Sequence, residues 1–577
     1  MNYLQDKINE PPGVFEKSKF FLFSFLTSFI FLFFLSKNSP LYPLNTCGDV
    51  NTYFTIGRSL LDGKVPYLDL VDHKGPMLYF FYAAAALVSK HSHFGVFILE
   101  LCSFSMFLYY NGRVLNLFSP EKMIMYLITP LTAFIILGSP SFCNGGSVEE
   151  MSISLFSCSF YIVLNRLKRT EYLTKEDFML LGLFFSMLFW IKFTLTGFYF
   201  GLVLFISIWY SSKKQFKKLL MGAIYFLLPF FLVTCVIFLF YYFKGALDEM
   251  LDIYFFKNIF SYATSKSPSE VFRCLMKSCY SFVIFNDLYF IVFTGCLFFM
   301  LLPIAPLTAK IILPEKWCTK TIFFVSWFIV SSILLCLYIF FDGYVNRFTI
   351  YIIIPGVVFT FLCWLFYGWN FSKKVFRRED PRVCGLVFLT LFMYWISNYS
   401  SNYYPYYFII FSSYLVFGWY FFFLFLQSFS KVEPFTGKLK NPFLFAVVYL
   451  IPVIAALCLS HNLWLIKYRR IDMPQSKFSE IIKQRKKNAK ILVYDVLDCG
   501  FYMFSGQPPS YKYFSRLNIP YVLEEQKKIV DSKDPDFIVT INFDANKIIR
   551  NYRLIKVVSI FEGGIQYQYQ LFEKRTD

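Results

Sequence analysis

A small set of charged side chains in otherwise apolar surroundings could act on a substrate that contains a phosphate. A carboxylate can accept a proton from an attacking group, and lysine or arginine can stabilise the negative charge that develops on a departing phosphate. The sequence contains both residue types near apolar runs. The candidates are Asp49 in CGDVNTY, Lys74 in DHKGP, Glu149 and Glu150 in GSVEEM, Lys192 in FWIKFTL and Arg347 in YVNRFTI.

Asp49 and Lys74 also have purely structural explanations. Asp49 opens a stretch with helical spacing and could simply cap that helix. Lys74 precedes Gly75 and Pro76, where a helix is expected to begin, and a helix N-terminus favours an anion over a cation. The lysine could therefore face a bound phosphate together with the free backbone N–H groups, or extend to lipid headgroups.

The other candidates allow the same two interpretations. Glu149 and Glu150 could complement the dipole of the helix that follows them. Lys192 could mark a short turn between two spans, and Arg347 could form a local ion pair with Asp342. An ionisable residue that interrupts an apolar run is nevertheless a candidate functional residue.

The composition indicates that a membrane-embedded scaffold must position these residues. Of the 577 residues, 57% are apolar, including 78 Phe and 42 Tyr. Only helices or closed barrels satisfy the backbone in lipid, so we expect an all-α polytopic bundle of about thirteen transmembrane helices. The spans are placed near residues 19–36, 94–112, 123–139, 150–165, 178–191, 194–210, 219–243, 281–306, 321–341, 349–369, 383–399, 406–428 and 441–460.

The distribution of basic residues predicts the topology. The net charge of +19 is spread over short clusters between spans, which is typical of cytoplasmic loops and unlike a nucleic-acid-binding face. Segments such as NRLKRTEYLTKED are expected inside, and GSPSFCNGGSVEE and NYSSNYYP, which lack Lys and Arg, outside. This alternation requires GPMLYFFYAAAALVSK to be an interfacial helix at the outer surface instead of a span. All the candidate residues then share the extracytoplasmic face.

The chain changes character after about residue 460. The segments AKILVYDVL, DFIVTINF and YRLIKVVSIF are short β-rich runs. We expect residues 1–460 to form the membrane domain and residues 461–577 a small extracytoplasmic α/β domain. Its basic linker, KYRRIDMPQSKFSEIIKQRKKNAK, is expected to rest on anionic lipid.

Several of these segments resemble the GT-C superfamily of membrane glycosyltransferases. The most specific match is the pattern G..PY.D...HKGP.LY, from Gly63 to Tyr79, and NGGSVEEMSISLF and WIKFTLTGF match more loosely. The closest branch includes bacterial relatives of the protein O-mannosyltransferases and the lipid A aminoarabinose transferase. The segments GFYMFSGQPPSYKYF and DPDFIVT are similar to the small extracytoplasmic domain found in many of these enzymes.

The resemblance implies roles for individual residues. Asp49 would be the catalytic base or would position the acceptor. Lys74 and Lys192, with Arg347, would contact the donor phosphate, and either Glu149 or Glu150 would be the acidic residue of the second outer loop. Independently of the resemblance, the outer loop near residues 244–280 is expected to form interfacial helices over the site, with Asn258 and Tyr262 as contacts of the sugar or the acceptor. Tyr53, Asp69 and His73 are further candidates for such contacts.

The cofactor prediction stays open. Many members of the superfamily carry an acidic pair at the first position, where this chain has Asp49 followed by Val50 and Asn51. Metal dependence is therefore not carried over. The 14 Cys and 4 His show no metal-binding spacing, so no metal ligand is assigned, and a divalent cation is left open.

The implied reaction is transfer of a sugar from a polyprenyl-phosphate donor to a hydroxyl or amine of a cell-envelope glycan, lipid or protein. Single-step displacement would invert the anomeric centre, at the extracytoplasmic face of a bacterial cytoplasmic membrane. No nucleic-acid partner is expected. The alternatives are a transporter or flippase, or a polymerase or ligase, of lipid-linked saccharides. A transporter would show internal repeats or charged, broken helices at mid-membrane, for which only Asn286 and Asp287 are candidates.

Overall fold

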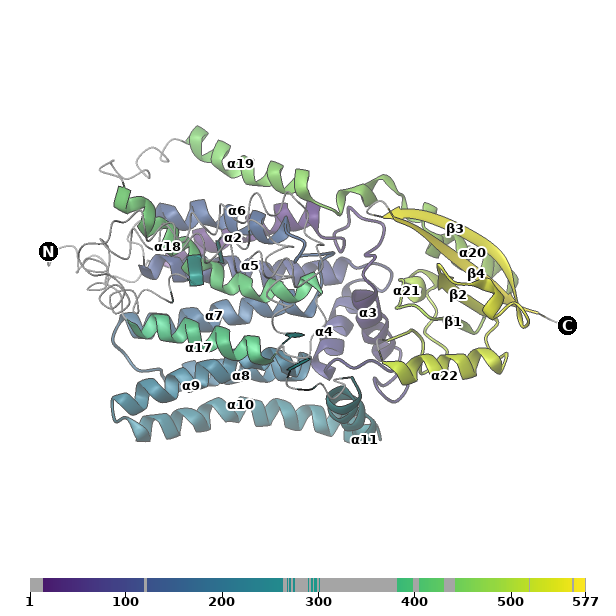
Figure 1. Ribbon diagram of the computed structural model, residues 1–577, viewed down its shortest axis with the longest axis horizontal. Helices are drawn as coiled ribbons and strands as arrows, with labels where there is room; N and C mark the ends of the chain where they lie inside the picture. Colours follow the sequence, from purple (N-terminus) through teal and green to yellow (C-terminus); the bar gives the residue numbers. More distant parts are fainter. Residues whose placement is uncertain are drawn as a thin grey trace.

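The computed structural model is a bundle of long helices with a small α/β domain at one end (Figure 1). It describes residues 14–118, 122–262, 381–397, 404–429, 442–517, 519–562 and 565–575, and isolated positions between 267 and 300. Arg347, Asp342, Asn286 and Asp287 lie outside the described residues, as do the predicted spans near 321–341 and 349–369 and most of the one near 281–306.

Each of the other predicted spans coincides with helical structure. The long helices are α2 (Val14–Leu35), α5 (Phe94–Phe118), α6 (Lys122–Leu137), α7 (Val148–Lys168), α8 (Lys175–Ile191), α9 (Gly197–Ser212), α10 (Phe216–Phe243), α17 (Pro381–Ser397), α18 (Leu415–Phe429) and α19 (Pro442–Leu459). Short 3-10 segments, η1 (Phe193–Thr196) and η3 (Pro405–Tyr414), precede α9 and α18.

Exposure of apolar side chains shows why this bundle needs lipid. Five of the described helices are long and apolar enough to cross a membrane. On α10, Phe231, Leu232 and Val236 are each about 60% exposed or more. Soluble proteins rarely expose an apolar surface of this kind to water. The chain is therefore a multi-pass membrane protein.

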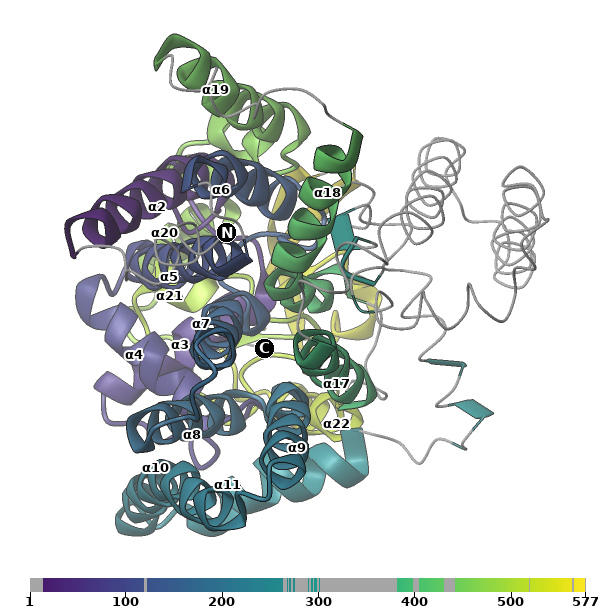
Figure 2. The same cartoon turned by 90° about the vertical axis from the view of Figure 1, so that its left-hand side faces the viewer.

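The helix α7 lies in the middle of the bundle. It packs against α5, while α8 packs against α10 and α9 against α17. Seen after a 90° turn, α8, α9 and α10 lie on one side of α7, and α2, α5 and α6 on the other (Figure 2).

Shorter elements cover the end of the bundle that carries the α/β domain. They are α3 (Gly48–Leu61), α4 (Pro76–Val88), α11 (Leu247–Leu251) and the π-helix η2 (Asp252–Tyr262). The helix α4 begins as the sequence predicts, with Gly75 at the N-cap and Pro76 following it. Its 13 residues rise about 20 Å, less than the ~30 Å hydrocarbon thickness of a bilayer.

The C-terminal domain contains a four-stranded sheet in the order β1-β2-β4-β3. The strands are β1 (Ile491–Val493), β2 (Phe537–Ile541), β3 (Tyr552–Glu562) and β4 (Ile565–Lys574), and the helices are α20 (Pro474–Arg485), α21 (Phe501–Ser505) and α22 (Pro520–Asp531). β1 and β2 are parallel and the other pairs antiparallel. The three β-rich runs of the sequence correspond to β1, β2 and β3, whereas β4 was not predicted.

This domain is docked directly on α3. Thr55 donates a hydrogen bond of 2.5 Å to the buried carboxylate of Asp498. Arg58 donates to the carbonyl oxygens of Tyr502 and Gln507. The loop before α3 is held as well, because Lys37, which is 2% exposed, pairs with Glu562 of β3 at 2.8 Å. The last part of the chain thus fixes the position of one of its first helices.

Candidate active site

The carboxylate of Asp49 lies at the end of the bundle nearest the C-terminal domain. Asp49 is in the first turn of α3, with Cys47 at the N-cap, so it does not itself cap the helix. The hydroxyl of Tyr406, from η3, donates to its Oδ2 at 3.2 Å. Two segments more than three hundred residues apart in the chain therefore meet at this carboxylate.

Lys74 belongs to a chain of three polar side chains that precedes α4. Its Nζ lies 2.8 Å from Nε2 of His73, and Nδ1 of His73 lies 3.2 Å from Oδ1 of Asp72. The other oxygen of Asp72 accepts from the hydroxyl of Tyr79 at 2.8 Å. Because the ammonium donates to Nε2, the hydrogen of a neutral imidazole must be on Nδ1, facing Asp72.

The charge states in this chain follow from burial and from neighbouring charges. Burial disfavours the charged form of Asp72, yet His73 and Lys74 hold its pKa at about 2. Burial and the Lys74 ammonium lower the pKa of His73. Burial opposes the charge of Lys74 too, but the carboxylates of Asp49 and Asp72 leave its pKa raised. An anionic Asp72, a neutral His73 and a cationic Lys74 result.

Lys74 has no carboxylate at ion-pair distance among the described residues. Asp49, Lys192 and Tyr407 are nevertheless close enough to affect its pKa. The site thus holds a buried ammonium whose remaining hydrogens are available, next to a carboxylate.

Lys192 and Glu149 form the second pair of charges in the site. Nζ of Lys192 lies 2.6 Å from Oε1 of Glu149, and the side chains are 15% and 3% exposed. The ring of Tyr407 lies 4.2 Å from the same Nζ. Lys192 sits between α8 and η1 in extended backbone, which directs its side chain out of the helix and toward the first turn of α7.

Glu150 points elsewhere. Its Oε2 accepts from the backbone N–H of Gly146 at 2.8 Å, and its carboxyl group contacts that of Glu100 on α5. Oε1 of each glutamate has no hydrogen-bond partner. Glu100 also accepts from Ser36 and Asn38. Glu150 therefore holds the loop before α7, and Glu149 faces Lys192.

The remaining candidates are placed as follows. Asn258 of η2 donates to the carbonyl oxygen of His73 at 2.8 Å and so contacts the loop that carries Lys74. Tyr53 lies one turn after Asp49 and packs edge-on against Tyr82, and burial together with the Asp49 carboxylate raises its pKa well above the ordinary value. The carboxylate of Asp69 accepts from the backbone N–H of Val65, within its own turn.

Tyr262 is the last residue of η2, and Arg347 is outside the described residues.

Three residues of this site were missed in the sequence. Asp72 orients His73, and Tyr406 and Tyr407 contact Asp49 and Lys192. A usable signal was present, because NYSSNYYPYY is a tyrosine-rich segment in a predicted outer loop without Lys or Arg. Among the described residues, no group of three or more His, Cys, Asp and Glu is placed to hold a metal ion.

Comparison with known proteins gives a similarity in structure only. No family model and no curated protein sequence matches the chain. The chain resembles solved structures of ArnT from Cupriavidus metallidurans. One, bound to undecaprenyl phosphate, has 11% identity and a TM-score of 0.46, and the other, in the apo state, has 9% identity and a TM-score of 0.48. Each alignment covers 95% of this chain and 97% of the other. ArnT is the lipid A aminoarabinose transferase named in the resemblance above.

Proposed function

We propose that this chain is a membrane glycosyltransferase of the GT-C type that transfers a sugar from a polyprenyl-phosphate donor to a cell-envelope acceptor. The observation that carries the proposal is the buried ammonium of Lys74: the nearby carboxylate of Asp49 raises its pKa, and no carboxylate lies at ion-pair distance from it among the described residues. Transfer of a glycosyl group from a phosphate needs a proton acceptor and a cation at one place.

Lys74 stabilises the departing phosphate in this proposal. His73 and Asp72 fix its direction, since the Nζ–Nε2 and Nδ1–Oδ1 contacts leave the ammonium little freedom. Such preorganisation matters because the charge on the phosphate oxygen develops during the reaction, and a fixed, partly desolvated cation need not reorient to stabilise it.

Asp49 accepts the proton of the attacking hydroxyl or amine. The hydrogen bond from Tyr406 orients its carboxylate and leaves one oxygen for the acceptor. Because the base removes the proton from a group that attacks the side of the sugar opposite the phosphate, a single displacement inverts the anomeric centre.

Lys192 contributes a second cation, held in place by Glu149 and Tyr407. Arg347 remains a proposed phosphate contact. Tyr53, His73, Asn258, Asp69 and Tyr262 remain proposed contacts of the sugar or the acceptor. We place this site and residues 461–577 at the extracytoplasmic face of a bacterial cytoplasmic membrane.

Transfer measured with purified protein in lipid vesicles, from a polyprenyl-phosphate-linked pentose or hexose, tests the proposal. Asp49→Asn keeps an acceptor for Tyr406 but removes the base, and kcat should fall by about 10²- to 10⁴-fold. Lys74→Met removes the cation and should lower kcat/KM by about 10²- to 10³-fold.

Asp62→Asn is the matched control, because Asp62 ends the same helix and forms an exposed pair with Lys90. Turnover by Asp49→Asn equal to that of the control would show that Asp49 is not the base.

A further inference from the structure

The hairpin formed by β3 and β4 extends beyond the sheet of the C-terminal domain. Its two strands pair with each other as far as Glu562 and Ile565. β2 pairs with β4 only from Tyr569 onward, so the part of β4 before Tyr569 has β3 as its only neighbouring strand among the described residues. This end of the hairpin reaches back toward the bundle (Figure 1). Phe561, Glu562 and Ile565 are called the hairpin tip below.

The apolar side chains of the hairpin tip are exposed on both faces of the hairpin. Phe561 is 54% exposed and Ile565 58%. Ile565 lies opposite Glu562, and Phe561 lies opposite Gln566. Since paired residues of antiparallel strands point to the same side and successive residues to opposite sides, Phe561 and Ile565 point to opposite faces. A protein docked on one face would cover only one of them, whereas a medium that surrounds the tip would cover both.

The contacts of the hairpin tip place it where membrane-spanning helices end. Glu562 pairs at 2.8 Å with Lys37, which follows closely after the span that ends at Leu35 of α2. Asn462, just after the end of α19, donates to the carbonyl oxygen of Leu35 at 2.7 Å. The helices α2 and α19 therefore end at one level, and the hairpin tip lies beside that level.

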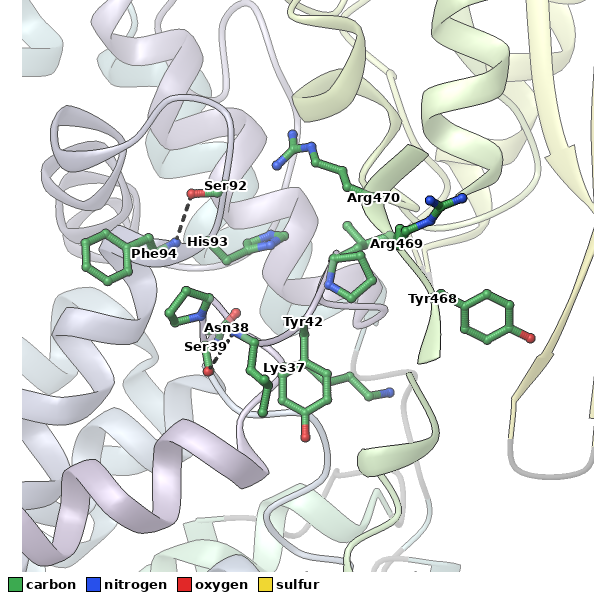
Figure 3. A pocket seen from close by; sticks show the side chains of 14 residues that line it. Lys37, Asn38, Ser39, Tyr42, Ser92, His93, Phe94, Tyr468, Arg469 and Arg470 are labelled. Atoms are coloured by element: carbon green, nitrogen blue, oxygen red, sulfur yellow. Dashed lines mark hydrogen bonds between the residues drawn. The ribbon is translucent and has the colours of Figure 1, made fainter. Parts of the chain in front are cut away.

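The surroundings of Lys37 are those of a membrane interface. Its ammonium lies 5.5 Å from the centre of the Trp464 ring, and Lys37 lines a cavity of about 350 Å³ together with Tyr468 (Figure 3). Trp and Tyr are enriched at the level of lipid headgroups. In the last turns of α2 and α19, Phe34 is 37% exposed and Leu459 48%. The apolar surface that the bundle presents to lipid thus continues to the level of the hairpin tip.

We propose that the hairpin tip inserts into the headgroup region of the bilayer, with the side chains of Phe561 and Ile565 in contact with lipid. Both side chains gain free energy by leaving water, and Glu562 avoids lipid by pairing with Lys37. The C-terminal domain is then held at two places, at α3 and at the membrane surface. The hairpin tip shares no residue with the site around Asp49 and Lys74, so this contact does not depend on the proposed function.

Photo-crosslinking in a bilayer tests the contact directly. Full-length protein with Phe561→p-benzoylphenylalanine is placed in nanodiscs of phosphatidylglycerol and phosphatidylcholine, irradiated, and analysed by mass spectrometry for lipid adducts. Ile549→p-benzoylphenylalanine is the matched control, because Ile549 is an apolar residue of the same domain that is 44% exposed. It precedes the start of β3, whose 11 residues extend about 36 Å. We expect severalfold more lipid adduct at position 561 than at position 549.

Fluorescence quenching gives a second measurement that does not depend on the crosslinking chemistry. Phe561→Trp and Ile549→Trp each add one indole to the same native tryptophans, so the difference between the two variants reports the added ring. In nanodiscs of lipids brominated on the acyl chain, the fluorescence added by Phe561→Trp should be quenched more strongly than that added by Ile549→Trp. Both positions are exposed, so neither substitution disturbs the packing of the domain.

The two measurements decide between lipid and protein as the partner. Lipid adducts and quenching that are both stronger at position 561 support the insertion of the hairpin tip. Equal adduct formation and equal quenching at the two positions would overturn the proposal. A crosslink from position 561 to a second copy of the chain, in place of lipid, would show that the tip is a protein interface and would overturn it as well.

Discussion

Replacing Asp498 by asparagine should remove a pH dependence from the docking of the C-terminal domain on α3. Asp498 is fully buried at this interface, where it accepts from Thr55 at 2.5 Å and from the backbone N–H of Gly500 at 2.9 Å. Burial raises its pKa from 3.8 to about 6. The asparagine can keep both hydrogen bonds, because its oxygen can accept from Gly500 and its amide can donate to the hydroxyl of Thr55.

The size of the change in stability follows from the pKa shift of Asp498. A carboxyl group whose pKa is higher in the folded than in the unfolded state binds more protons when folded, so stability falls as pH rises between the two values. The shift from 3.8 to about 6 corresponds to ~3 kcal/mol, present in full below pH ~4 and lost above pH ~6. Asp498→Asn should therefore be more stable than the wild type near neutral pH, by up to that amount.

The thermal midpoint of full-length protein in detergent, followed by intrinsic fluorescence across this pH range, measures the difference. Asp495→Asn is the control, because Asp495 forms a surface pair with Arg516 close by in the sequence. If the thermal midpoints of the wild type and Asp498→Asn change in parallel from about pH 4 to pH 7, Asp498 does not titrate in this range and the reasoning is refuted.

Two further predictions concern the packing and charges of the site. Gly75→Ala should destabilise the protein by about 1 to 3 kcal/mol, because a Cβ atom would lie 2.0 Å from the carbonyl oxygen of Trp190. Gly63→Ala is the comparison variant, and its thermal midpoint is corrected for the backbone strain at φ +88°. Equal thermal midpoints of the two variants after that correction would contradict the prediction. Lys192→Met leaves the buried Glu149 unpaired and should destabilise by about 3 to 5 kcal/mol, whereas adding Glu149→Gln should restore part of that loss. An additive double variant in thermal unfolding would show that the two charges do not interact.

The long helices were predictable because an apolar run of about twenty residues has few alternatives in lipid. The start of α4 was predictable for a local reason, since Gly75 and Pro76 are suited to the N-cap and first turn. β4 was missed even though IQYQYQLFEK alternates in the way a half-buried strand does. Its aromatic and glutamine residues were not counted as an apolar face.

The pairing of charges could not be predicted. Lys192 and Glu149 are 43 residues apart, and nothing in their local sequence links them. Glu149 and Glu150 are adjacent, yet successive helical residues point about 100° apart, so one faces Lys192 and the other Glu100. Tyr406 reaches Asp49 across 357 residues, and nothing in the local sequence of either residue indicates that contact.

The pairing of Lys37 with Glu562 also sets an order of assembly. The loop that leads to Asp49 is synthesised well before the strand that neutralises its buried lysine, because the two partners are 525 residues apart. Thr55 and Arg58 of α3 likewise wait for partners beyond residue 497. The helix that carries the proposed base therefore acquires its full set of contacts only after β3 has been synthesised, so a chain truncated before that strand lacks an assembled site.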